Sequence, residues 1–277
     1  MRFSYLWATL GFILAFAGCV SVDSSARTPS VGAGIDLNQK DAEAIGRKIW
    51  QNECNGTVEG LTSWNEGEDF PSLGIGHFIW YVPGRRGPFE ESFPPLIDYM
   101  EGRGVRNIPQ WVADAEGSPW GSRREFLADQ NSPRMKELRQ FLADTVPEQT
   151  GFIVRRLERA LPKMKEATRS EGDRKRLEEN FYKVASTRTG VYALIDYVNF
   201  KGEGVNPEER YQGQGWGLRD VLLEMKGTEG GRASANEFSE AAKRVLQRRV
   251  ANSPPERGES RWTAGWMNRC ESYKHGF

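Results

Sequence analysis

The chain has 277 residues, of which 38% are hydrophobic and 27% charged, so it carries enough apolar side chain to close a sizeable core, which excludes a disordered chain. Lys and Arg number 38 and Asp and Glu also number 38, whereas proteins that bind duplex nucleic acid carry an excess of cations. We therefore expect no nucleic-acid partner. Only residues 3–20 form a long uncharged apolar stretch, which excludes a polytopic membrane protein.

The first 18 residues have the pattern of a bacterial export signal, with Arg2 as their only charge and an apolar core over residues 5–17. The following Ala-Gly-Cys19 resembles the lipobox of bacterial lipoproteins, in which the peptide is cut before an acylated cysteine. The resemblance implies a signal peptide at 1–18 and membrane attachment through a lipid on Cys19. Val20 favours the periplasmic side of the outer membrane. An ordinary secretory signal or an uncleaved anchor is the alternative.

Residues 19–36 are rich in Ser, Thr, Pro, Gly and Ala, which predicts a flexible tether ahead of a single domain at 37–277. An exported compartment is oxidising, so Cys54 and Cys270 could pair as a disulfide. The alternative is two buried free thiols. The three cysteines and two histidines are too scattered for a closed zinc site, and no spacing argues for a metal or a cofactor.

Apolar residues at helical spacing predict a helix over residues 39–53, with Asn38 as its N-cap. The same period returns in several stripes beyond residue 120, which indicates a body of packed helices. Residues 54–94 differ, because they are rich in Gly, Asn, Glu and aromatics and contain a run at 72–82 that could pair as strands. These patterns predict an α+β fold, mainly α, in which a small β lobe lies beside a helical body.

The residues with the clearest chemistry lie where the first helix meets this lobe. Glu53 ends the helix, an acidic turn with Glu66 and Glu68 follows, and Ser72 precedes Gly-Ile-Gly-His77. Glycoside hydrolysis needs one protonated carboxyl to donate to the leaving oxygen and one ionised carboxylate to stabilise the transition state or activate water. A Glu among apolar neighbours could stay protonated, and one in a polar turn would stay ionised.

This order of a helix ending in Glu, an acidic turn and then hydroxyl-x-Gly-Ile-Gly-His resembles the active-site signature of phage-type lysozymes of the lysozyme superfamily. By position, the resemblance implies Glu53 as general acid, Glu66 or Glu68 as second catalytic residue, Ser72 in place of the family's Thr, and His77 as a supporting residue. Glu also replaces the family's Asp in the turn. Lytic transglycosylases of the same superfamily use a single Glu and release 1,6-anhydro products, so that reaction stays open.

The resemblance implies a lysozyme-like fold and a peptidoglycan glycosidase that cleaves β-1,4 bonds of glycan strands in the bacterial envelope. Aromatic and amide side chains are expected to bind the sugars, namely Trp64, Trp80, Tyr197, Asn199 and Trp216. One alternative is a non-catalytic peptidoglycan-binding or envelope-binding lipoprotein with the same groove. A second alternative is an exported protein whose Gly-Ile-Gly-His turn is only structural. A third is an enzyme in which the Cys54 thiol, beside His77, acts as the nucleophile.

Overall fold

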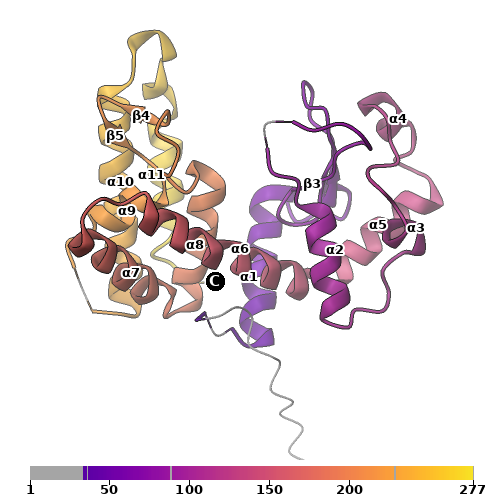
Figure 1. The fold of residues 1–277 in the computed structure, drawn as a ribbon, viewed down its shortest axis with the longest axis horizontal. Coiled ribbons are helices and arrows are strands. Elements are labelled where there is room, and N and C mark those ends of the chain that lie inside the picture. Colours follow the sequence, from indigo (N-terminus) through magenta and orange to yellow (C-terminus); the bar gives the residue numbers. More distant parts are fainter. Residues whose placement is uncertain (1–33, 36, 88, 228, 277) are drawn as a thin grey trace, which may run out of the picture.

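A computed structural model describes residues 34–35, 37–87, 89–227 and 229–276 (Figure 1). Of the residues that the structure describes, 61% are helical and 4% lie in strands, with small antiparallel sheets, so the predicted mainly helical α+β fold is confirmed. None of the helices described is long and apolar enough to cross a membrane. The predicted signal peptide and Cys19 lie outside the described residues.

One lobe carries the larger sheet, and its elements are α1 (Gln39–Cys54), η1 (Glu59–Leu61), β1 (Thr62–Ser63), β2 (Ser72–Leu73), β3 (Phe78–Ile79), α2 (Phe93–Gly102), α3 (Gln110–Ala113), α4 (Arg123–Ala128) and α5 (Pro133–Asp144). The long helix α6 (Val146–Glu166) leads to the second lobe. That lobe contains α7 (Glu171–Ala185), α8 (Arg188–Lys201), β4 (Arg210–Tyr211), β5 (Gln214–Gly215), α9 (Leu218–Glu224), α10 (Arg232–Asn252), η2 (Pro255–Arg257), η3 (Glu259–Trp262) and α11 (Thr263–Ser272).

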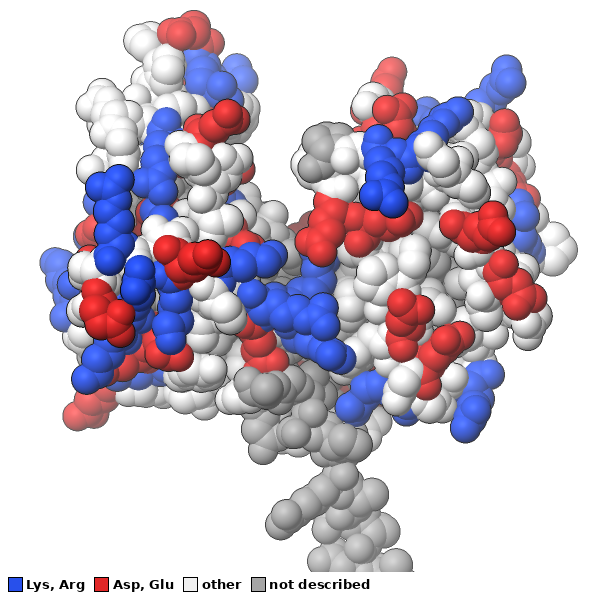
Figure 2. All heavy atoms as spheres, viewed as in Figure 1, with Lys and Arg blue, Asp and Glu red and all other residues white. Residues whose placement is uncertain are grey.

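The two lobes stand on either side of a hollow (Figure 2), and the long helix α6 runs between them (Figure 1). Figure 2 shows acidic side chains on the side of the hollow formed by the first lobe, and basic side chains on its floor. The first lobe's sheet is antiparallel in the order β1-β2-β3, and it lies beside the hollow. In its register Ser72 pairs with both Ser63 and Ile79, so β2 is the central strand.

Helix α1 forms as its sequence predicts. The Asn38 side chain accepts a hydrogen bond from the backbone N–H of Asp41, and the helix ends where Asn55 adopts a left-handed conformation. Ile45 and Ile49 are buried. Gly46 allows close packing on α6, because a Cβ there would lie 2.4 Å from Thr150 Oγ1. The middle of α1 is thereby packed closely against the helix that joins the lobes.

The packed chain begins before the predicted domain boundary at residue 37. Ile35 is buried, and its backbone N–H donates to Glu158 Oε1 at 2.8 Å. The composition of residues 19–36 predicts a tether throughout, yet this single isoleucine provides enough apolar surface to dock on α6.

Both cysteines of the predicted pair are buried and free. The Cys54 thiol faces the carbonyl of Gly74 and the ring of His77, at 3.8 and 3.7 Å. Cys270 lies in α11, where its carbonyl accepts from Ser239 of α10. The disulfide is therefore absent, because the Cys54 side chain is directed at the β2–β3 turn of its own lobe.

We predict that Gly46→Ala lowers the free energy of unfolding by about 1–3 kcal/mol, since the added methyl group overpacks the contact between α1 and α6. Urea unfolding measures the change. Gly102→Ala is the matched control, because a Cβ at Gly102 meets nothing within 4 Å. Equal stabilities for the two variants would contradict the close approach.

Candidate active site

Glu53 lies in the last turn of α1 and reaches towards both lobes. Its side chain is 25% exposed. Its Oε1 accepts a hydrogen bond from Arg269 Nη2 at 3.2 Å, and its Oε2 lies 3.9 Å from His77 Nδ1. Arg269 belongs to α11 of the second lobe, whereas His77 belongs to the turn between β2 and β3. The carboxylate therefore lies where the two lobes meet.

The Gly-Ile-Gly-His sequence forms the turn between β2 and β3 and docks on α6. The backbone N–H of Ile75 donates to the side-chain oxygen of the fully buried Gln149 at 2.9 Å. Gly74 has a φ of 69°, and a Cβ there would lie 2.3 Å from the same oxygen, so only glycine fits. Gln149 in turn donates to the carbonyl of Leu142 at 2.6 Å. The turn is thus fixed by a buried amide of α6.

His77 follows this turn and adopts the left-handed region, with a φ of 47°. Such a conformation is uncommon outside glycine and tends to occur at functional sites. The ring lies between the last two residues of α1, with Nδ1 near Glu53 and Nε2 3.7 Å from Cys54 Sγ. His77 therefore joins the Glu53 helix to the sheet, as the sequence predicts for a supporting residue.

The thiol of Cys54 is poorly suited to act as a nucleophile. Burial, and then the neighbouring Glu53 carboxylate, raises the pKa of Cys54 to about 12. The reactive form of a cysteine is the thiolate, which is scarce at neutral pH when the pKa is this high. The alternative of a Cys54 and His77 nucleophile has no support in this geometry.

Arg269 is held in place by a buried acid that sequence reasoning missed. Asp196 of α8 is 3% exposed and accepts from Arg269 Nε and Nη2 at 2.7 and 2.8 Å. The hydroxyl of Tyr273 donates to the same carboxylate at 2.6 Å. Burial alone would lower the pKa of Arg269, but the hydrogen bonds and charge of Asp196 raise it. The guanidinium that touches Glu53 is therefore a fixed cation.

The predicted acidic turn is ordered by hydrogen bonds around Glu68. Its backbone N–H donates to the carbonyl of Asn65 at 3.3 Å, and its carboxylate accepts from the Asn65 amide at 3.1 Å. Gly67 supplies the positive φ of the turn, at 84°. Glu66 is exposed, whereas Glu68 is partly buried. Of the two candidate second carboxylates, Glu68 is the one held in a defined position.

Ser72 lies inside the sheet. It is only 5% exposed, and its carbonyl accepts from the hydroxyl of Ser63 at 3.4 Å. The hydroxyl that stands in place of the family's Thr is therefore mostly covered in the structure.

Four of the five predicted sugar-binding residues lie in the core, which is the alternative position for such aromatic side chains. Trp64 and Trp80 are 5% and 2% exposed, and their rings pack on other aromatic rings. Tyr197 is fully buried and donates to the carbonyl of Trp216. Trp216 is 8% exposed, with the Arg249 guanidinium 4.1 Å from its ring centre. Only Asn199 is exposed.

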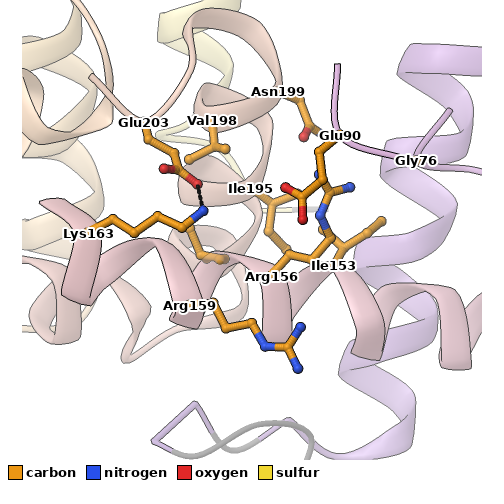
Figure 3. Close-up of a pocket in the computed structure, with 11 residues that line it drawn as sticks. Gly76, Glu90, Ile153, Arg156, Arg159, Lys163, Ile195, Val198, Asn199 and Glu203 are labelled. Atoms are coloured by element: carbon orange, nitrogen blue, oxygen red, sulfur yellow. Dashed lines mark ion pairs between the residues drawn. The ribbon is translucent and has the colours of Figure 1, made fainter. Parts of the chain in front are cut away.

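An open pocket lies beside the Gly-Ile-Gly-His turn, on the floor between the lobes (Figure 3). Its lining includes Gly76 of the turn, Asn199 of α8, Glu203, and three cations of α6, Arg156, Arg159 and Lys163. Lys163 forms an ion pair with Glu203 at 3.6 Å. Within the described chain no group of His, Cys, Asp and Glu is arranged to hold a metal ion.

Comparisons of this chain with protein-family models, with curated proteins and with solved structures found no match. The site consists of a carboxylate at a helix end, a fixed cation from the opposite lobe, a histidine and a polar pocket.

We predict that Asp196→Asn lowers the free energy of unfolding by about 3 kcal/mol or more, because it leaves the Arg269 cation without its buried counter-charge. Tyr273→Phe is the control, since it removes one hydrogen bond to Asp196 and keeps the ion pair. It should cost less, about 1.5–3 kcal/mol. Urea unfolding of both variants makes the comparison, and a smaller loss for Asp196→Asn would contradict the role of the ion pair.

Proposed function

We propose that this protein is a lysozyme-type glycosidase of the bacterial envelope that cleaves β-1,4 bonds of peptidoglycan strands. The supporting observation is the position of Glu53, partly exposed at the end of the first helix, beside the glycine-rich turn and opposite Arg269 of the second lobe. Two lobes connected by a long helix around a hollow support a lysozyme-like fold (Figure 1). A glycan strand in the hollow would pass the Glu53 carboxyl, which donates a proton to the leaving oxygen.

The contact that a substrate would replace is the hydrogen bond between Arg269 and Glu53. Arg269 makes its two shorter hydrogen bonds to Asp196, and its bond to Glu53, at 3.2 Å, is the longest. A sugar that enters between Glu53 and Arg269 breaks this longest contact, while Arg269 keeps its place on Asp196. The Glu53 carboxyl then faces the sugar.

Glu68 is the better placed candidate for the second carboxylate, because the Asn65 amide holds it. If it acts, it stabilises the oxocarbenium-like transition state or activates a water, and the product has a new reducing end. If no second carboxylate acts, the C6 hydroxyl of the sugar attacks its own anomeric carbon. That reaction consumes no water and gives a 1,6-anhydro product.

The second candidate function is a non-catalytic lipoprotein that binds peptidoglycan or another envelope component. It is favoured by the contact of Glu53 with Arg269, which occupies one oxygen of the carboxylate that a glycosidase would direct at its substrate. In both proposals the lipid anchor on Cys19 and the outer-membrane location rest on the first 20 residues alone.

The first test is release of muropeptides from purified sacculi, identified by mass spectrometry. We expect Glu53→Gln to lower the rate about 100-fold or more, because an amide cannot donate the proton. Glu43→Gln, in the same helix, is the matched control and should keep full activity. Equal release by the parent and Glu53→Gln would exclude Glu53 as the acid. Retained binding without release by either protein would favour the binding lipoprotein.

The second carboxylate is tested on the same substrate. Glu68→Gln is expected to reduce release about 100-fold, and Glu66→Gln, which alters the exposed acid of the same turn, should have little effect. Released fragments with reducing ends support this assignment. Anhydro fragments at an unchanged rate from Glu68→Gln would instead assign the reaction to Glu53 alone.

A further inference from the structure

The side chains that reach the surface beside Glu53 include aromatic residues that the sequence pattern did not single out. Trp262, Trp266 and Arg269 are spaced four and three residues apart, which places them on one face of α11 and the turn that precedes it. Arg269 on this face contacts Glu53. The face therefore starts at the candidate acid and continues along the second lobe.

The aromatic rings on this face form an unbroken series of contacts, which we name the aromatic strip (Phe200, Trp266 and Trp262). The Arg269 guanidinium lies 4.5 Å from the ring centre of Phe200. Phe200 and Trp266 have ring centres 6.3 Å apart, and Trp266 stacks on Trp262 at 5.9 Å. The strip thus leads from the Glu53 carboxylate outwards over several side chains.

The outer end of the strip is open to solvent. Trp262 is 43% exposed, whereas Trp266 and Phe200 are half-buried against the core. Neither indole N–H of the strip has a hydrogen-bond partner in the part of the chain that the structure describes. The indole N–H groups of Trp50, Trp64, Trp111 and Trp120 all donate to oxygen atoms. The strip therefore offers the exposed ring surface of Trp262 and two indole N–H donors that have no partner among the described residues.

Cations lie beside the rings of the strip. Lys201 Nζ is 3.6 Å from the ring centre of Trp266, and the exposed guanidinium of Arg261 is 4.4 Å from that of Trp262. Burial, and then Arg249, lowers the pKa of Lys201 to about 7. Arg261 makes no ion pair with any other described residue, so it is free to move aside or to donate to a ligand.

This combination suits a saccharide. One face of a pyranose ring carries C–H groups that pack on an aromatic ring, while its hydroxyl and N-acetyl groups accept from N–H donors at the edge. A purely apolar partner surface would leave the indole donors and the Arg261 cation without partners, which costs free energy on burial.

We propose that the aromatic strip binds sugar units of the glycan strand away from the cleavage point, continuing the substrate groove from Glu53 onto α11. The identity of the ligand rests on the proposed function, but the binding surface itself does not depend on catalysis. Trp262 then acts only on strands long enough to reach it.

The test is isothermal titration calorimetry of N-acetylglucosamine oligomers with two and with six sugars, all in the Glu53→Gln background so that nothing is cleaved. We expect Trp262→Ala to weaken binding of the hexamer about tenfold and to leave the dimer unchanged. Trp262→Phe keeps a ring and should restore most of the hexamer affinity. Tyr182→Ala removes a similarly exposed aromatic, 40% exposed on α7, and should change neither.

Unchanged hexamer affinity in Trp262→Ala would overturn the proposal. So would a shift from dimer to monomer on size exclusion, which would assign Trp262 to contact between two copies of the chain. Failure of the proposed function is distinguishable, because a protein that releases no muropeptides can still lose hexamer affinity with Trp262→Ala. Conversely, if the parent protein cleaves peptidoglycan normally and Trp262→Ala keeps full affinity for the hexamer, the glycosidase proposal stands and the proposed sugar-binding role of the aromatic strip is rejected.

Discussion

The guanidinium of Arg269 is the group on which the arrangement of the site depends. It receives its position from Asp196, a carboxylate that is almost fully buried in α8 and that also accepts from Tyr273. From this fixed point it spans to Glu53 at the end of α1. A buried acid of one lobe thereby fixes the cation that contacts the partly exposed Glu53 of the other lobe.

On the side of the first lobe, a second interaction fixes the position of the Gly-Ile-Gly-His turn, and it involves an uncharged side chain. The Gln149 amide of α6 holds the backbone of the Gly-Ile-Gly-His turn, and the turn in turn places His77 against Glu53 and Cys54. The side chain of Gln149 occupies the space that a Cβ at Gly74 would need. The glycine in the motif is thus explained by its packing against α6, whatever reaction the site performs.

The features that depend on neighbouring residues in the chain were predictable from the sequence. The helix over 39–53, its Asn38 cap and the short strands near Ser72 follow from local periodicity and capping, and the structure confirms them. The juxtaposition of Asp196 with Arg269 was not predictable, because 73 residues separate them and either could equally be a solvated surface charge. Asp196 did leave one signal, since it interrupts an otherwise apolar stripe.

The burial of the aromatic residues that were expected to bind sugars was unpredictable for a different reason. A tryptophan in a glycine-rich segment can face the core or the solvent, and sequence spacing alone does not distinguish the two. Trp80 turned inwards to pack on Phe93, and Trp216 lies beneath Arg249. The sequence did not point to Trp262 and Trp266 as binding residues. Their helical spacing places them on the same face as Arg269, and this matters only once the structure shows that Arg269 contacts Glu53.

Arg269 connects the candidate acid Glu53 to the aromatic strip. Arg269 touches both Glu53 and Phe200, so the cation that contacts the candidate acid is also the first contact of the aromatic strip. Under the proposed function, a strand that packs along Phe200 and Trp266 would reach the acid past Arg269. The contacts that select an extended glycan would then include Arg269 itself, and the buried Asp196 holds that residue in place.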